Sequence, residues 1–201
     1  MLTTKEAIEK RRSIRKFKPD AIPQKVIEEL IEAARLAPSG SNAQPWRFKI
    51  VADQVIRNKL AEAAHNQKFI AQAPVVIVCC ASLKEYADNM ALGAQDLGSI
   101  EAVEPDIVKT IINRADALHS LPLAQLGPIV SFHVAIAIEH IVLRALDYDL
   151  GTCWVKLVDA EKIREIFNWD ENMFVVALLP IGYPAEDPKP RRRKVLSEII
   201  I

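Results

Sequence analysis

Two clusters of basic residues lie near opposite ends of the chain, and each could bind an anion. They are Arg11-Arg12-Ser13-Ile14-Arg15 and Arg191-Arg192-Arg193-Lys194. The forked guanidinium group of arginine matches the oxygens of a phosphate, and the hydroxyl of Ser13 adds a donor. Cations also suit the C-terminal end of a solvated helix, because they interact favourably with its dipole. For the first cluster, a phosphate site and a solvated helix end therefore both remain open.

A loop rich in amide and hydroxyl side chains follows the first cluster. It runs Pro38-Ser39-Gly40-Ser41-Asn42-Ala43-Gln44-Pro45-Trp46. Asn42 and Gln44 bring amide donors and acceptors that a hydrophobic core does not need, so they suit a flat ligand with polar edges. The alternative is a turn whose serine and asparagine side chains only cap local backbone groups.

The elements around this loop are predicted from the spacing of apolar residues. Val26, Ile27, Leu30, Ile31 and Ala34 recur at helical intervals, with Pro23 placed for the first turn of a helix that continues to Leu36. The alternation of Trp46, Phe48 and Ile50 predicts a strand over 47–51, and an amphipathic helix over 54–64 follows. The unbroken apolar run 75–80 predicts a strand that is buried on both faces.

The second half of the chain contains the most apolar helix. Residues 83–118 predict two helices and loops of uncertain register, and 121–147 predict a helix that is buried on most sides and suggests a subunit interface. At Gly151 the chain is predicted to pass from this helix into a strand. Asp159 is placed to cap a helix to Phe167.

The last segments are a strand and a tail. Residues 174–179 predict a second buried strand that ends at Pro180. Prolines then make the chain extended, and the apolar terminus 195–201 is capable of forming a strand but has no partner of its own. Pairing with another subunit is the expectation for it.

Composition narrows the function classes. The 201 residues are half hydrophobic, which predicts one domain with a substantial core. Twenty-six basic and 26 acidic residues give no net charge, so no global field favours nucleic acid or a membrane surface. Three cysteines without metal spacing fit a reducing cytoplasm. Thr3 and Glu6 predict a helix cap rather than a signal peptide.

Two further classes of site are not expected. The apolar stretch 129–146 is interrupted by His133, Glu139, His140 and Arg144, so the sequence predicts no bilayer-spanning helix. His133 and His140 lie seven residues apart without a third ligand, and we predict no metal site there. No serine or cysteine has an identifiable histidine base, so no catalytic triad is expected.

The order and spacing of five segments resemble the nitroreductase family of FMN-dependent oxidoreductases over essentially the whole chain. The segments are 11–15, 38–46 with its N-x-Q-P-W run, 150–154, 182–184 and 191–194. This resemblance implies an α+β fold with a mixed, mainly antiparallel central sheet surrounded by helices. It also implies a single domain over 1–201, and an intertwined homodimer in which an arm, 184–201, reaches the partner subunit.

The resemblance also implies two FMN sites at the subunit interface. Arg11, Arg12 and Ser13 would hold the phosphate and ribityl chain, and Arg191 and Arg193 would complete the phosphate cage. The isoalloxazine ring and ribityl chain would be met by residues of the other subunit, namely Pro38, Ser39, Gly40 and Asn42, with Gln44 at the flavin edge.

The remaining implied contacts concern the chemistry of the flavin. Arg15 and, less directly, Lys68 would approach the pyrimidine edge and raise the reduction potential. Gly151, Thr152, Cys153 and Trp154 would bring backbone N–H groups near flavin N5. In two steps, NADH or NADPH would reduce FMN and a small acceptor such as a nitroaromatic or quinone would then be reduced, without a catalytic acid or nucleophile from the protein.

Several alternatives stay open at this point. A flavin reductase that supplies reduced flavin would share every motif, and a non-enzymatic FMN-binding or anion-binding protein would also carry the basic clusters. Relatives in the family remove iodine from tyrosines, cleave flavin or oxidise azolines. The region 83–118, which would shape the substrate pocket, matches no subgroup. Asp149 stands where the family often has glycine, in a left-handed turn that tolerates aspartate.

Overall fold

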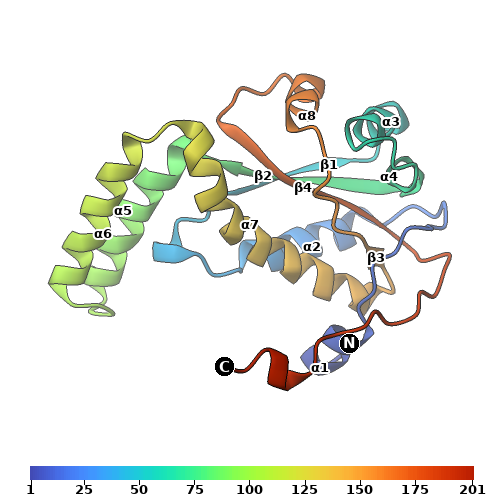
Figure 1. Ribbon diagram of the computed structural model, residues 1–201, viewed down its shortest axis with the longest axis horizontal. Helices are drawn as coiled ribbons and strands as arrows, with labels where there is room; N and C mark the ends of the chain where they lie inside the picture. The colour runs from blue at the N-terminus through green and yellow to red at the C-terminus, as the bar shows by residue number, and fades with distance from the viewer.

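A four-stranded sheet forms the centre of the molecule in a computed structural model that describes residues 1–201 (Figure 1). Its strand order is β1-β2-β4-β3, with every neighbouring pair antiparallel. The strands are β1 (Trp46–Val51), β2 (Val75–Ser82), β3 (Gly151–Thr152) and β4 (Met173–Gly182). The predicted strands are confirmed. The strand β4 does not end at Pro180, as expected, but continues through it to Gly182.

The central strand β2 is buried along its whole length, as its apolar run predicts. Since successive side chains of a strand point to opposite faces, the two faces of the sheet receive different sets of residues. Ile77 and Cys79 belong to one hydrophobic cluster, whereas Val76, Val78 and Cys80 belong to the other. The strand therefore serves two cores.

Helices cover both faces of the sheet, which gives three layers (Figure 1). One face carries α3 (Gln54–Ala63), α4 (Phe69–Gln72) and α8 (Ala160–Phe167), and the other carries α2 (Gln24–Arg35) and α7 (Leu123–Ala145). Asp53 and Asp159 cap α3 and α8 by accepting bonds from backbone N–H groups, and the second of these caps was predicted. The arrangement is the expected α+β architecture.

The region 83–118 forms two helices, as predicted, and they pack against each other as a hairpin. It consists of α5 (Lys84–Ser99) and α6 (Pro105–His119), and it projects from the body beyond the sheet (Figure 1). The hairpin joins the core at its base, where Tyr86, Met90 and Leu118 are buried. Beyond this base, α5 contacts the loop that precedes β1, where Asn89 donates to the Ala43 carbonyl.

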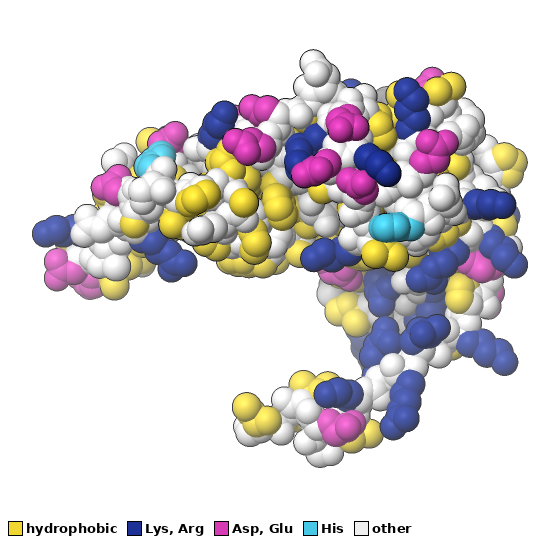
Figure 2. Space-filling view, turned by 45° about the horizontal axis from the view of Figure 1, so that its top comes forward, with side chains coloured by type: hydrophobic (Ala, Val, Ile, Leu, Met, Phe, Trp, Pro, Cys, Tyr) yellow, Lys and Arg dark blue, Asp and Glu magenta, His cyan; other side chains and the backbone are white.

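Residues of the C-terminal tail line a cavity with the last turn of the N-terminal helix, and the tail then extends away from the body (Figure 2). The helix α1 (Thr4–Lys10) begins with the predicted capping box of Thr3 and Glu6. After it, Ser13 forms a parallel bridge with Thr152, so the sheet region is mixed at this edge. The short turns η1 (Gly40–Asn42), η2 (Leu146–Tyr148) and η3 (Leu196–Glu198) complete the fold. The terminus, expected to be strand-like, contains η3 instead in the single chain.

The helix α7 lies within the range 121–147 that was predicted to form one buried helix. By length and composition alone Leu123–Tyr148 could cross a membrane, but its burial is that of a core helix. Half of its most apolar stretch is buried, and ten residues from Leu126 to Ala145 are fully enclosed. Its apolar character is explained by its place under the sheet. Phe132 nevertheless remains 55% exposed in the single chain.

Candidate functional site

The two basic clusters predicted to bind a phosphate lie in one cavity of about 830 Å³. One wall comes from the end of α1 and the next residues, and the other comes from the tail. Figure 2 shows Lys and Arg side chains gathered where the tail leaves the body. Among the lining residues, six are basic and one, Glu9, is acidic; the basic ones are Arg11, Arg12, Arg15, Lys189, Arg191 and Arg193. Ser13 also lines the cavity, whereas Arg192 and Lys194 do not.

Backbone pairing holds the two walls together. Ile14 N–H donates to the Thr152 carbonyl at 2.9 Å, and Ala185 N–H donates to the Lys16 carbonyl at 2.9 Å. The Glu186 carboxylate accepts from the N–H groups of Arg15 (2.5 Å) and Lys16 (3.0 Å). The segment after α1 is therefore fixed between β3 and the start of the tail, and Arg11 to Arg15 keep a defined place beside it.

Glu139 on α7 joins this region and was not predicted as a site residue. Its carboxylate lies 3.9 Å from the Arg11 Nε and accepts from the Trp154 indole N–H at 3.3 Å. Glu186 was likewise missed. Both residues contact partners far away in sequence, so no local pattern could have identified them.

Arg15 and Lys68 are related through Phe69. The Arg15 guanidinium lies 5.9 Å from the centre of the Phe69 ring, and Lys68 directly precedes Phe69 at the start of α4. Lys68, however, lines a different cavity, together with Gln54 and Asn58. Both cations are therefore close to Phe69, Arg15 in space and Lys68 in sequence, but they line no shared cavity.

The segment 151–154 forms the short strand β3 and its continuation. Cys153 N–H donates to the Pro180 carbonyl at 3.2 Å, and Val155 N–H donates to the Leu178 carbonyl at 3.0 Å. Since successive N–H groups of an extended chain point to opposite sides, those of Thr152 and Trp154 face away from β4. Ser13 and Ile14 pair along that edge of Thr152, so the Trp154 N–H, which has no backbone partner, is the one that can meet a ligand.

Two residues of this segment have structural roles as well. A Cβ on Gly151 would overlap the Ile14 side chain, so glycine is needed there for the close approach of the two segments. Burial raises the pKa of the Cys153 thiol, while Arg15 and a hydrogen bond from Ser13 act in the opposite direction. A thiol in this state is no activated nucleophile, in line with the packing role expected for it.

The loop 38–44 lies elsewhere, between the base of the hairpin and α7. Ser41, Asn42 and Gln44 have left-handed backbones, with φ of 49°, 52° and 46°. Gln44 N–H donates to the Ser39 hydroxyl at 3.0 Å. Asn89 on α5 donates to the Ala43 carbonyl at 3.2 Å, which fixes the loop to the hairpin.

Two residues that sequence reasoning missed also shape this loop. A Cβ on Gly93 would overlap the Ser41 carbonyl, so α5 contacts the loop backbone directly. His133 on α7 accepts from Gly40 N–H through Nδ1 at 3.3 Å. Glycines and histidines occur in many helices, and only their place beside the loop distinguishes these two.

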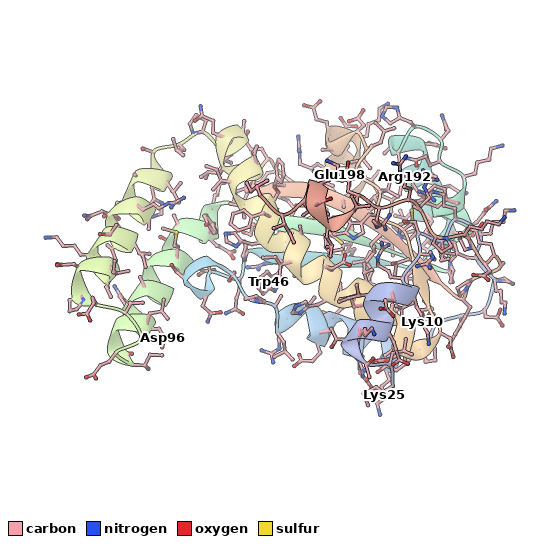
Figure 3. The ribbon with its side chains drawn as sticks, turned by 60° about the horizontal axis from the view of Figure 1, so that its bottom comes forward. Lys10, Lys25, Trp46, Asp96, Arg192 and Glu198 are labelled. Atoms are coloured by element: carbon pink, nitrogen blue, oxygen red, sulfur yellow. The ribbon has the colours of Figure 1, made fainter.

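The basic cavity and the loop are separate parts of one chain. The loop borders a cavity of about 540 Å³ with Asn89, Leu92 and Asp96, and this cavity shares no residue with the basic one. In Figure 3, Asp96 lies at the outer end of α5, on the opposite side of the molecule from Lys10 and Arg192. The predicted phosphate contacts and the ring contacts predicted for the loop 38–44 therefore do not meet within one copy.

Neither histidine of α7 is placed as a metal ligand. His133 contacts Gly40 and Tyr86, and His140 Nδ1 lies 3.0 Å from the Ala33 carbonyl. No group of three or more His, Cys, Asp or Glu side chains in residues 1–201 could hold a metal ion. Asp149 has φ of 55° and ends η2, which confirms the left-handed turn expected there.

Comparison with known sequences gives matches over the whole chain. A model described as the nitroreductase family matches residues 8–183. A protein of Thermus thermophilus named NADH dehydrogenase is 32% identical over 201 residues, which cover 100% of this chain and 96% of that protein. An iodotyrosine deiodinase of Thermotoga neapolitana is 25% identical and covers 96% of this chain and 92% of its own.

Solved structures share the fold. A crystal structure from Exiguobacterium sibiricum, determined in complex with FMN, superposes with a TM-score of 0.81 and 21% sequence identity. The match covers 100% of this chain and 97% of the other. At this identity the similarity establishes the architecture, a sheet enclosed by helices with a projecting hairpin.

Proposed function

Because the chain belongs to the nitroreductase family, we propose that it is an FMN-dependent oxidoreductase that uses NADH or NADPH to reduce a small acceptor. Nitroaromatics and quinones are the proposed acceptor classes. The buried, unpaired state of all three cysteines supports a cytoplasmic location. The FMN-bound structure of similar fold supports the choice of cofactor.

The residues of the basic cavity fit a flavin phosphate. A phosphate monoester carries about −1.5 to −2 charge and three acceptor oxygens at neutral pH. Arg11, Arg12, Arg191 and Arg193 line the cavity with guanidinium donors, and the Ser13 hydroxyl adds another. One carboxylate, that of Glu9, is outnumbered by these cations, so an anion is the ligand that the cavity favours.

The separation of the two halves carries the proposal. One copy of the chain holds the phosphate-binding half beside β3 and the ring-binding half beside the hairpin, with no residue in common. A complete site requires a second copy that brings its loop 38–44 to the first copy's cavity. We therefore propose a homodimer with two composite FMN sites.

Exposed apolar residues support this assembly. The large apolar side chains of Phe132 and Ile136 are exposed on α7, and those of Ile199, Ile200 and Ile201 are exposed at the end of the tail. Burial of such groups lowers the free energy by about 25 cal/mol for each Å² of apolar surface removed from water. In the proposed dimer, α7 packs at the interface and the arm 184–201 extends onto the partner.

The protein's contribution to the reaction is positioning and electrostatics. When bound, FMN supplies hydride transfer in two steps, first from the nicotinamide and then to the acceptor. Arg15 would face the edge of the ring where negative charge accumulates, with Lys68 on the same side. The Trp154 N–H, which has no backbone partner, would be offered to the flavin. Asn42 and Gln44 of the partner would orient the ring, and the hairpin would limit the access of water.

The visible absorbance spectrum of the purified protein tests this proposal. The spectrum is recorded anaerobically before and after addition of NADH and then NADPH, with free FMN as the control for non-enzymatic reduction. Flavin bands that bleach with either nucleotide support the oxidoreductase. Release of the reduced flavin would favour the flavin reductase, and a protein that binds FMN without being reduced would favour the non-enzymatic alternative.

A further inference from the structure

A buried histidine and a buried tyrosine lie directly beneath the loop 38–44. His133 is 2% exposed and Tyr86 is 5% exposed. The Tyr86 hydroxyl lies 3.1 Å from His133 Nε2, and His133 Nδ1 lies 3.3 Å from the Gly40 N. The chain of contacts thus runs from α5 through α7 to the loop.

The direction of each hydrogen bond in this chain follows from the Gly40 N–H at one end. A backbone N–H can only donate, so Nδ1 of His133 must be the unprotonated acceptor, and the proton of the neutral ring is on Nε2. That proton is then donated to the Tyr86 oxygen. The Gly40 N–H thus selects the tautomer of His133, and the Tyr86 hydroxyl, which can accept, gives the Nε2–H a partner and fixes the orientation of the ring. Gly40 also packs closely against the ring: a Cβ added to it would lie 3.1 Å from His133 Cε1, which leaves little room for a different arrangement.

The loop needs such support because its backbone is strained. Ser41, Asn42 and Gln44 are all non-glycine residues in the left-handed region. Strain of this kind persists only where the surrounding structure enforces it, and it concentrates at ligand-binding sites. Three contacts from outside the loop enforce it, from Asn89, Gly93 and His133. Of these, only His133 can change its hydrogen bonding with pH.

We propose that His133, oriented by Tyr86, is a positioning residue that keeps the loop 38–44 in its flavin-binding conformation, and that protonation of His133 releases the loop. This inference rests on the proposed function, in which the loop contacts the flavin of the partner subunit. When His133 is protonated, its Nδ1–H opposes the Gly40 N–H, and the contact is lost.

The surroundings set the pH at which this occurs. Burial lowers the pKa of His133 below its usual 6.5, because a charged ring is poorly solvated there. Tyr86 of α5 faces the ring, and Arg114 of α6 lies close enough to affect Tyr86 electrostatically. Neither group stabilises an imidazolium. The loop is therefore held at and above neutral pH, and its support is lost as pH falls through the lowered pKa.

Flavin affinity as a function of pH tests the proposal. FMN binding is measured by fluorescence quenching from pH 5 to 8 for the wild-type protein, His133→Asn, His133→Leu and Tyr86→Phe. Asparagine offers Oδ1 as an acceptor for Gly40 but does not titrate, whereas leucine offers none. At pH 7.5 we expect His133→Leu to bind FMN about five- to thirtyfold more weakly than wild type. His133→Asn should recover most of this loss.

The acid limb separates positioning from simple destabilisation. The FMN phosphate itself titrates near pH 6, and it does so for every variant. The wild-type affinity should fall more steeply with acid than that of His133→Asn, and Tyr86→Phe should lie between wild type and His133→Leu at pH 7.5. Side-chain ¹⁵N NMR of the flavin-free protein should give the Nε2–H tautomer and a pKa below 6.5 for His133.

Each failure has a distinct meaning. Wild-type protein that does not bind FMN at pH 7.5 would overturn the proposed function, and this inference with it. Wild-type binding with unchanged affinity in folded His133→Leu, or the same acid profile in His133→Asn, would overturn the positioning role alone. An Nδ1–H tautomer in the NMR spectrum would do so too.

Discussion

Gly93 offers a direct test of whether the loop conformation matters. A Cβ added at this position on α5 would overlap the backbone oxygen of Ser41, which cannot rotate away as a side chain could. The substitution Gly93→Ala therefore forces the loop and the helix apart. On the order of 2 Å of separation is needed to restore an ordinary van der Waals contact.

The magnitude follows from two opposing effects. Alanine favours the helical backbone over glycine by about 1 kcal/mol, so α5 itself is not weakened. The loop must therefore move away from α5. A misplacement of about 1 Å in a group that positions the reactants can lower the rate by about 10²-fold. We expect Gly93→Ala to lower kcat/KM for NADH or NADPH oxidation by at least about 10²-fold and to weaken FMN binding.

The matched control is Gly98→Ala in the same helix. Its added Cβ would meet a methyl group of Val108 at 2.9 Å, away from the loop. Val108 is a side chain on α6 that can adjust, so this variant should keep near wild-type flavin affinity and turnover. Circular dichroism and thermal unfolding establish that both variants fold. Wild-type kcat/KM in a folded Gly93→Ala protein would refute the claim that the loop geometry controls the reaction.

Three further predictions concern the cavity and the tail. Replacing both Arg11 and Arg193 by Ala should reduce the favourable free energy of FMN binding by at least about 3 kcal/mol, since hydrogen bonds to charged groups contribute about 1.5–3 kcal/mol each. Arg192→Ala, outside the cavity, is the control. Full FMN occupancy of the double variant after ultrafiltration would contradict the phosphate assignment. Deletion of 190–201 should weaken both the dimer and the cofactor, so a stable yellow dimer by light scattering would exclude a role for the arm. Arg15→Gln should make the flavin potential more negative by about 30 mV, which equals ~1.4 kcal/mol for two electrons, and an unchanged potential in spectroelectrochemistry would remove Arg15 from that role.

Local patterns were enough to predict most of the secondary structure. The capping box at Thr3, the cap at Asp159 and the apolar run of β2 all depend on residues that are adjacent in sequence. For the terminus 195–201, pairing with a second subunit stays a prediction, because its β-branched residues favour a strand only where a neighbouring strand exists and the single chain provides none. The turn η3 forms in its place.

The candidate site was only half accessible to the same reasoning. Arg11, Ser13 and Arg193 were identified by charge and donor type, and they share a cavity. Glu139 and His133 could not be identified, because each acts on a partner made adjacent only by folding. A helical histidine is ordinary until its ring is found beneath a strained loop.

The division of the site into two supported halves explains why distant changes should converge on one property. In each copy, β3 fixes the basic segment through Ile14 and Thr152, and α5 and α7 fix the loop through Gly93 and His133. In the proposed dimer, both halves are thus ordered before assembly, which would reduce the entropy lost when FMN binds between two copies. A ligand that binds only the assembled state must stabilise it by mass action. Loss of an arginine from the cavity and displacement of the loop from α5 should therefore both appear as weaker cofactor binding and as easier dissociation of the dimer.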